Sequence, residues 1–154
     1  MRENVKSGGL RVDKEKMRKQ FEHALETHQE GTGELFMYSL LKFDFEYDEE
    51  NEVVRIEVPI SELMFNPIGF IHGGMITYIA DTAMGHLCAA FAERPGVSLE
   101  LKTQFFRSAK SGKIFAEASF LKKGRKAQFV ECLLKDDQER LLAKATATFL
   151  SIEE

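Results

Sequence analysis

The sequence predicts an α+β fold, in which a curved antiparallel sheet of about six strands wraps around one long buried helix. The helix is predicted because residues 74–93 are apolar on nearly every side, which is typical of a helix without a solvent-facing surface. The sheet is predicted because several later segments alternate apolar and polar residues across short turns. An antiparallel sheet with one apolar face needs a cover, and this helix is the segment best suited to provide it.

Length and composition indicate one domain with an extension. The chain has 154 residues, enough to bury a substantial core, and we expect an extension over residues 1–33 and one domain over residues 34–154. The net charge of −4 argues against nucleic acid as the main partner. Cys88 and Cys132 lack the spacing of a metal or redox motif, which indicates core thiols in a reducing compartment. No signal peptide or membrane span is recognisable, so we expect a cytoplasmic protein with no membrane partner.

An extra amphipathic helix is expected at residues 13–28, ahead of the sheet. Asp13 is of a residue type that caps helix N-termini, and the glycines within residues 31–33 are expected to end the element. Residues 1–12 are expected to be loosely attached. The apolar positions that follow helical spacing are Met17, Phe21, Ala24 and Leu25.

Two strands are expected before the central helix and four after it. The first two cover residues 34–48 and 51–59, with a hairpin turn between them. The central helix is expected to end at residues 94–96, where Pro95 cannot continue it. In the strand after the helix, Leu99, Leu101, Thr103 and Phe105 are expected to share one face. The four later strands are predicted at residues 97–106, 113–121, 126–135 and 141–152.

Asp81 is the single formally charged residue between Glu62 and Glu93, and it lies inside the apolar helix. An isolated carboxylate in such a place is costly unless something binds it or uses it. One interpretation is a buried group satisfied by the hydroxyls of Thr77 and Thr82. The other is a general base or nucleophile whose pKa is raised by burial. We favour the functional interpretation and assign the neighbouring Thr82 to the substrate site.

Gly73 and Gly74 follow His72 at the start of the central helix. The first turn of a helix leaves N–H donors unpaired and attracts negative charge, and glycine lets a ligand approach this backbone closely. Such a site can hold the oxyanion that forms when a thioester or ester carbonyl is attacked. The alternative is that the two glycines only make the turn into the helix. The presence of His72 before them and Asp81 after them favours the oxyanion site, with Gly74 also contacting substrate.

Four other residues have both a structural and a functional interpretation. Asn66 is typical of an Asn-Pro turn, yet its amide could contact the attacking water or the carbonyl. His72 is expected to cap the helix or to help polarise the substrate. His86 lies about 140° around the helix from Asp81, so the two do not share a face. Ser98 is either an ordinary strand hydroxyl or a residue that returns to the site.

Positive charge gathers at two strand ends, in the turn of residues 122–126 and at Arg107 and Lys110. These side chains could contact the phosphates of a coenzyme A carrier. Solvated hairpin tips have the same appearance in sequence. Arg107 is our candidate for substrate binding, and no metal site is predicted.

Gly73 and Asp81 are eight residues apart, which corresponds to about 12 Å along a helix axis. An aspartate side chain cannot cross that distance to a carbonyl held at Gly73. If both residues serve one reaction, the carboxylate must come from a second subunit. Two such helices packed antiparallel about a two-fold axis would form two equivalent sites. The sequence therefore predicts a homodimer with interfacial active sites.

The order of elements over residues 34–152 is similar to that of hotdog-fold acyl-CoA thioesterases, specifically the phenylacetate-pathway (PaaI-type) group. The joint spacing of several residues carries this resemblance, while no single residue is specific. These residues are Asn66, Gly69, His72, Gly73, Gly74, Asp81 and Gly85.

The resemblance implies the hotdog fold and hydrolysis of the thioester bond of an acyl-CoA or aryl-acyl-CoA. It implies that the Gly73 N–H binds the thioester oxygen and that Asp81 of the neighbouring subunit is the base or nucleophile. Asn66 matches the Asn of the family, and Ser98 matches a residue that positions the attacking water in some members. The resemblance also implies homodimers that assemble into homotetramers, with no cofactor beyond the CoA of the substrate.

Two other functions remain open from the sequence. Some hotdog enzymes use an Asp/His pair on enoyl-CoA, so Asp81 and His86 suggest a hydratase or dehydratase, although they lie on different helix faces. A non-catalytic module that binds acyl-CoA is the third possibility. The helix at residues 13–28 is not explained by the core motif.

Overall fold

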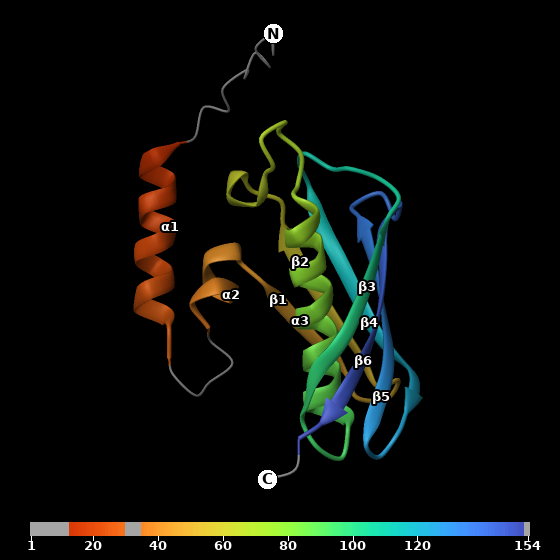
Figure 1. Cartoon of the computed structure of the whole chain (residues 1–154). Coiled ribbons are helices and arrows are strands. Elements are labelled where there is room, and N and C mark those ends of the chain that lie inside the picture. Colours follow the sequence, from red (N-terminus) through yellow and green to blue (C-terminus); the bar gives the residue numbers. More distant parts are fainter. Residues whose placement is uncertain (1–12, 30–34, 153–154) are drawn as a thin grey trace, which may run out of the picture.

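The computed structural model describes residues 13–29 and 35–152, and Figure 1 shows the helix α3 lying along one face of a single sheet. The pairings in this sheet are antiparallel, in the strand order β1-β2-β4-β5-β6-β3. The predicted fold class, a curved six-stranded sheet around a long helix with an extra N-terminal helix, is confirmed. The helices are α1 (Lys14–Thr27), α2 (Phe36–Leu41) and α3 (Gly73–Phe91), with a 3₁₀ turn at Glu62–Met64. The strands are β1 (Asp44–Asp48), β2 (Val53–Pro59), β3 (Gly96–Phe105), β4 (Lys113–Lys123), β5 (Ala127–Asp136) and β6 (Leu141–Ser151).

The core lies between α3 and the inner face of the sheet, where α3 packs mainly against the strands β2 to β6. The helix contributes large side chains, and Ile79, Met84 and Leu87 are fully buried. The strands contribute both large and small side chains, and among the small ones Ala118 of β4 and Ala145 of β6 are fully buried. Because alanine side chains are short, the helix can lie close to the sheet without leaving voids. Even with α3 this apolar, no helix in the described ranges is both long and apolar enough to span a bilayer.

The prediction of one strand over residues 34–48 is wrong in its first half. Phe36–Leu41 is the helix α2, and the strand β1 is limited to Asp44–Asp48. The run is apolar at nearly every position, so its periodicity does not distinguish helix from strand over so few residues. Packing decides the outcome: Leu41 is buried, and the first residue of α2 packs edge-on against Phe21 of α1, with ring centroids 5.2 Å apart.

Strand β3 forms one edge of the sheet and pairs with β6. A bulge between Ser98 and Glu100 shifts its register. The predicted face of this strand is therefore wrong at Leu99, which is 61% exposed. Beyond the bulge, Leu101 and Thr103 pair with buried alanines of β6 and return to the inner face. Strict alternation fails because a bulge adds one residue to the strand.

Helix α1 confirms the predicted amphipathic helix. Asp13 is its N-cap, with Oδ1 accepting the Lys16 N–H at 3.0 Å. Figure 1 shows α1 beside α2 rather than against the sheet, and the Thr27 hydroxyl donates to Ser39 Oγ of α2 at 2.8 Å. The predictions for residues 1–12 and for the helix end at residues 31–33 lie outside the described residues. The division between extension and domain near residue 33 stays a prediction.

Leu87→Ala is expected to lower the free energy of unfolding by about 2–5 kcal/mol, because truncation of a buried side chain leaves a cavity between α3 and the sheet. Leu25→Ala is the matched control, since Leu25 is also helical but is 56% exposed. Urea unfolding followed by circular dichroism compares the two. Equal losses would contradict the packing of α3 against the sheet.

Candidate active site

The N-terminus of α3 presents one free backbone donor. His72 is the N-cap, and its Nδ1 accepts the Gly74 N–H at 2.9 Å. The N–H groups of Met75 and Ile76 bond to the His72 carbonyl oxygen. Among the described residues the Gly73 N–H has no hydrogen-bond partner. Gly73 can therefore offer its N–H to a ligand oxygen, whereas the Gly74 donor is occupied.

The loop before this helix is built around Asn66. Its Oδ1 accepts the N–H groups of Ile68 and Phe70, both at 3.1 Å, and its backbone N–H donates to the Phe70 carbonyl at 2.7 Å. Gly69 completes the turn with φ at 81°, a conformation that favours glycine. The structural interpretation of Asn66 is thus confirmed by its contacts. A contact of its amide with water or substrate stays a prediction.

Asp81 is half-buried in the middle of α3, and its Oδ1 is buried with no hydrogen-bond partner among the described residues. Desolvation raises the pKa of Asp81 above its ordinary value, and a hydrogen bond with the Ser98 side chain acts in the opposite direction. The two threonines expected to satisfy the carboxylate have other partners. Thr77 donates to Thr103 Oγ1 at 3.2 Å, and Thr82 bonds to tyrosines. The carboxylate is therefore incompletely satisfied on a rigid helix.

Gly73, Thr77 and Asp81 are spaced four residues apart, so they form one stripe along α3. This stripe faces β3. The helix and the strand run in opposite directions, and a Cβ placed on Gly73 would meet the Phe105 ring at 3.2 Å. Because β3 is an edge strand, the stripe lies beside the open edge of the sheet. The strand residues that meet the stripe, in order from Gly73 to Asp81, are Phe105, Thr103 and Ser98.

Two tyrosines that the sequence analysis missed lie near Asp81. Tyr38 of α2 and Tyr78 of α3 both hydrogen-bond to Thr82. Burial is the main cause that raises the pKa of each phenol, and the charge of Asp81 adds to it. Tyr78 could have been found from sequence, since three positions before Asp81 places it on the adjacent helix surface. Tyr38 could not have been found from sequence, because its segment was predicted to be a strand. Its position near α3 results from how distant segments pack in the fold.

His86 lies in a cluster of aromatic side chains. Its Nδ1 is 2.6 Å from the Tyr47 hydroxyl, and its Nε2 is 3.3 Å from the Tyr38 hydroxyl. Its ring stacks on Phe45 with centroids 4.4 Å apart, and burial lowers the pKa of His86, which favours the neutral ring. No hydrogen bond or ion pair joins His86 to Asp81 within the described structure. An Asp81–His86 pair acting on enoyl-CoA therefore has no geometric support.

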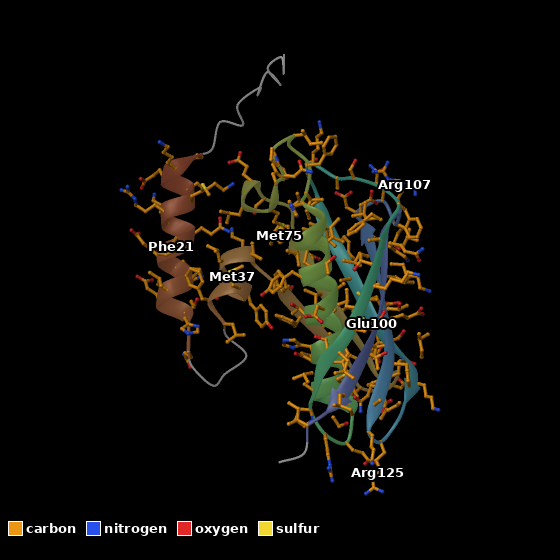
Figure 2. All side chains as sticks on the ribbon, in the orientation of Figure 1. Phe21, Met37, Met75, Glu100, Arg107 and Arg125 are labelled. Atoms are coloured by element: carbon orange, nitrogen blue, oxygen red, sulfur yellow. The ribbon has the colours of Figure 1, made fainter. Side chains whose placement is uncertain are left out.

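The other predicted substrate contacts are dispersed. Thr82 is buried, and its hydroxyl is engaged by the two tyrosines. Gly74 donates its N–H to His72. Arg107 is exposed beyond the end of β3, with Nη1 donating to the Leu141 carbonyl at 3.4 Å (Figure 2). The structure does not bring these residues to one point, and their contacts with substrate stay predictions.

The described part of the chain has no candidate site for metal or thiol chemistry. No group of three or more His, Cys, Asp and Glu side chains there is placed to hold a metal ion. Cys88 and Cys132 are free and buried, as expected of core thiols. Burial raises the pKa of Cys88 to about 11 and raises that of Cys132 further, so neither is a thiolate nucleophile at neutral pH.

Comparison with known families agrees with this arrangement. Residues 68–143 match the sequence model of the Thioesterase superfamily, and this span contains Gly73, Asp81 and Ser98. The chain carries a thioesterase superfamily domain. The resemblance stated from the sequence is thereby confirmed, and the sheet and helix order given above is that of the hotdog fold.

Individual relatives of this thioesterase are distant in sequence but similar in fold. The 1,4-dihydroxy-2-naphthoyl-CoA hydrolase of Escherichia coli K12 is 26% identical over 119 residues, which cover 75% of this chain and 86% of the relative. A phenylacetic acid degradation-related protein of Ralstonia eutropha JMP134 is 25% identical with a TM-score of 0.70, covering 85% and 98% of the two chains. A Bacillus halodurans protein solved with CoA has a TM-score of 0.81 at 23% identity, covering 91% and 93%. Family and fold together indicate an acyl-CoA thioesterase.

At neutral pH we expect Asp81→Asn to make the thioesterase more stable than the wild type. A raised pKa means that the charged carboxylate is less favourable in the folded than in the unfolded state, and this penalty is present above the folded-state pKa. The gain should shrink as the pH falls through the raised pKa and vanish below about 3.9, where the carboxyl is protonated in both states. Thermal unfolding at neutral and acidic pH measures the difference.

Asp44→Asn, at an exposed position of β1, is the control for this comparison. It removes the same charge without removing a buried carboxylate. If Asp81→Asn destabilises the protein at neutral pH, the carboxylate makes favourable native interactions and the expectation is wrong. The same holds if both variants stabilise equally.

Proposed function

We propose that this protein hydrolyses the thioester bond of an acyl-CoA or aryl-acyl-CoA at sites shared between two subunits. Asp81 is the general base or nucleophile, and the Gly73 N–H is the oxyanion donor. The observation that carries the proposal is the pairing of a half-buried carboxylate with an unsatisfied N–H on one stripe of α3. A general base works best when its pKa is close to the working pH, and an oxyanion is stabilised by a hydrogen-bond donor that is already in place.

The relatives support CoA as the carrier of the acyl group. The Escherichia coli relative is named for hydrolysis of 1,4-dihydroxy-2-naphthoyl-CoA, and the Bacillus halodurans structure contains CoA. In our proposal CoA enters only as part of the substrate, and no metal or further cofactor takes part.

In the first form of the mechanism, Asp81 acts as a general base. The thioester oxygen accepts a hydrogen bond from the Gly73 N–H of one subunit, which polarises the carbonyl. The Asp81 carboxylate of the other subunit takes a proton from a water molecule while the water oxygen bonds to the carbonyl carbon. The tetrahedral oxyanion is held by Gly73. When it collapses, the C–S bond breaks, the CoA sulfur takes the proton from Asp81, and the free carboxylic acid is left.

In the second form, Asp81 acts as the nucleophile. Its carboxylate oxygen bonds to the carbonyl carbon and expels the CoA thiolate, which leaves a mixed anhydride on Asp81. Water then hydrolyses the anhydride and restores the carboxylate. The hydrogen bond between Ser98 and Asp81 suits either form, because it orients one oxygen and leaves the unpartnered Oδ1 to react. Ser98 is thus proposed to position the carboxylate or the attacking water.

The edge strand β3 supports the proposed dimer. It carries exposed apolar side chains, and Val97, Leu99 and Phe105 are each at least half exposed. An edge strand also leaves backbone hydrogen-bonding groups free for a partner. A two-fold axis beside β3 would set two α3 helices antiparallel, so that each Asp81 approaches the other chain's Gly73. The resemblance to PaaI-type thioesterases extends this proposal to a tetramer of two dimers.

Asp81→Asn is expected to lower kcat by about 10²- to 10⁴-fold, the usual contribution of a general base, while the circular dichroism spectrum stays that of the wild type. Thiol release from a panel of acyl-CoAs, followed with a thiol-trapping reagent, measures the loss. Asp44→Asn should keep full activity. An active Asp81→Asn enzyme would overturn the assignment.

The wild-type result in the same experiment separates the other functions. Binding of acyl-CoA without thiol release would indicate a non-catalytic module. Hydration of crotonyl-CoA in place of thiol release would indicate a hydratase.

Mixing two inactive variants tests the interfacial site. Gly73→Pro removes the N–H that is proposed to bind the oxyanion. Proline is tolerated at this first helical position, and the residue before it, His72, already has the extended backbone that a following proline requires, with φ −69° and ψ 136°. After subunit exchange, Gly73→Pro and Asp81→Asn chains should recover about a quarter of wild-type activity, because half of the dimers carry one intact site of two. Thiol release before and after exchange measures the recovery.

Gly73→Ala is the control for the mixing experiment. It places the same Cβ against Phe105 but keeps the N–H, so its loss of activity should be far smaller than that of Gly73→Pro. The absence of recovery after confirmed exchange would refute a site shared between subunits. That outcome would not affect the role of Asp81, which the activity of the Asp81→Asn variant tests separately.

A further inference from the structure

The ring of Phe105 lies against the first residue of α3. A Cβ placed on Gly73 would meet the Cζ, Cε1 and Cε2 atoms of this ring at 3.2, 3.4 and 3.7 Å. These atoms form the outer end of the ring, so Phe105 points its tip at the glycine. The shortest of these distances is tighter than ordinary van der Waals contact between carbon atoms. The ring therefore fills the space that a side chain at position 73 would need.

Contacts on both sides of Phe105 hold the ring in this place. Phe105 is the last residue of β3 that pairs with β6, and the next N–H, that of Phe106, donates to the Leu142 carbonyl at 2.8 Å. One helical turn further along the stripe, Thr77 donates to Thr103 Oγ1 at 3.2 Å. The strand is thus fixed to β6 at its end and to α3 two residues earlier. The ring consequently has a defined position relative to the start of the helix.

The ring is also close to the proposed oxyanion donor, the Gly73 N–H. The amide nitrogen and a Cβ are both bonded to the same Cα, so the end of the ring lies within about 6 Å of that nitrogen. A thioester oxygen that accepts this N–H would lie about 2.9 Å from the nitrogen. Its carbonyl carbon, and the two groups attached to that carbon, would then be near the ring. These groups are the CoA sulfur and the first carbon of the acyl chain.

The chemistry of the ring favours the acyl chain as its neighbour. Phe105 is 52% exposed in the single chain and offers no hydrogen-bonding group. The pantetheine arm of CoA carries amides, which need hydrogen-bond partners when they are removed from water. The first carbons of an acyl chain need apolar contact alone. A closely packed aromatic wall beside them leaves little room for an additional substituent.

We propose that Phe105 is a specificity-determining residue that selects acyl groups unbranched at the carbon next to the thioester carbonyl. This inference rests on the proposed function and defines the substrate class of the same site. Gly73 and Phe105 form a complementary pair, because the glycine leaves room for the ring and the ring closes that side of the oxyanion position. In the proposed dimer, Asp81 of the other subunit approaches the same glycine. The ring is then part of the wall around the reacting carbonyl.

Two isomeric thioesters, 2-methylbutanoyl-CoA and 3-methylbutanoyl-CoA, test this proposal. They differ only in whether the methyl branch is next to the carbonyl or one carbon further away. We expect the wild type to prefer the 3-methyl isomer in kcat/KM by about tenfold or more, the usual effect of one carbon group in a packed site. In Phe105→Ala this ratio should fall by about tenfold. The change in ratio between the two enzymes is the measure, because branching also slows the uncatalysed hydrolysis.

Phe106→Ala is the matched control. Phe106 is the next residue, has the same side chain and is 51% exposed, but its atoms are not among those nearest to Gly73. Its removal should leave the ratio between the isomers unchanged. Thermal unfolding and light scattering compare the fold and the oligomeric state of both variants with the wild type. Phe105→Leu, which keeps an apolar side chain but lacks the ring tip, replaces Phe105→Ala if that variant unfolds, and it should lower the ratio in the same direction.

The double variant Gly73→Ala/Phe105→Ala provides an independent readout. Gly73→Ala alone directs a methyl group at the ring end and should lower kcat/KM for 3-methylbutanoyl-CoA. The double variant should recover most of this loss, because the shortened side chain at position 105 leaves room for the methyl group. Such recovery is the non-additivity expected of two residues in contact. Simple addition of the two losses would contradict the complementary pair and overturn the proposal.

Binding of ketone analogues separates this inference from the proposed hydrolysis. In these analogues a CH₂ group replaces the thioester sulfur, so the carbonyl is kept but cannot be hydrolysed. Calorimetry with the 2-methylbutanoyl and 3-methylbutanoyl analogues measures discrimination without turnover. If the wild type discriminates between them and Phe105→Ala does not, the role of Phe105 stands, even where no thioester is hydrolysed and the proposed hydrolysis fails.

The opposite result would overturn the role of Phe105 and leave the proposed hydrolysis intact. It would be seen if the wild type hydrolyses both isomers with the same ratio as Phe105→Ala. Equal losses with both isomers in Phe105→Ala would have the same meaning, because they would show that the ring supports the fold, the subunit contact or the sulfur side of the thioester.

Discussion

The packing of α3 against the inner face of the sheet is the constraint on which the rest of the structure depends. The helix is apolar on nearly every side, and alanines such as Ala118 and Ala145 let it lie close to the strands. A helix held this way cannot slide or rotate without opening voids. Its rotation therefore fixes which residues face β3, and Gly73, Thr77 and Asp81 do so together. The geometry of the candidate site is thus a consequence of core packing, and flexible loops have little part in it.

The same burial perturbs the carboxyl group of Asp81. Desolvation raises its pKa, and Ser98 offsets this only in part. The neighbouring hydroxyls do not help, because Thr77 bonds to β3 and Thr82 bonds to tyrosines. A carboxylate left in this state weakens the folded protein at neutral pH, and its retention in a core helix is understandable if chemistry needs it.

The two ends of β3 have different chemical characters. At one end Phe105 lies against Gly73, whose N–H is unpaired. At the other end Ser98 meets Asp81. If a second subunit packed against β3 about a two-fold axis, the Phe105 end of one strand would lie beside the Ser98 end of the other. Each proposed active site would then take its oxyanion donor from one chain and its acid from the other.

Much of this protein follows from local sequence pattern alone. The alternation in β4, β5 and β6, the apolar helix and the Asp13 cap are each encoded by neighbouring residues, and the structure has them as expected. The isolation of Asp81, the diglycine after His72 and the eight-residue spacing between acid and donor are likewise properties of the sequence.

Tertiary structure decided what local pattern leaves open. The run at residues 36–41 suits a helix or a strand equally, and contact with α1 made it a helix that brings Tyr38 near Asp81. The bulge at Leu99 changed which side chains of β3 face inward. It thereby decided that Ser98 is the strand residue beside Asp81. Such features depend on which distant segments meet, and periodicity within one segment carries no information about that.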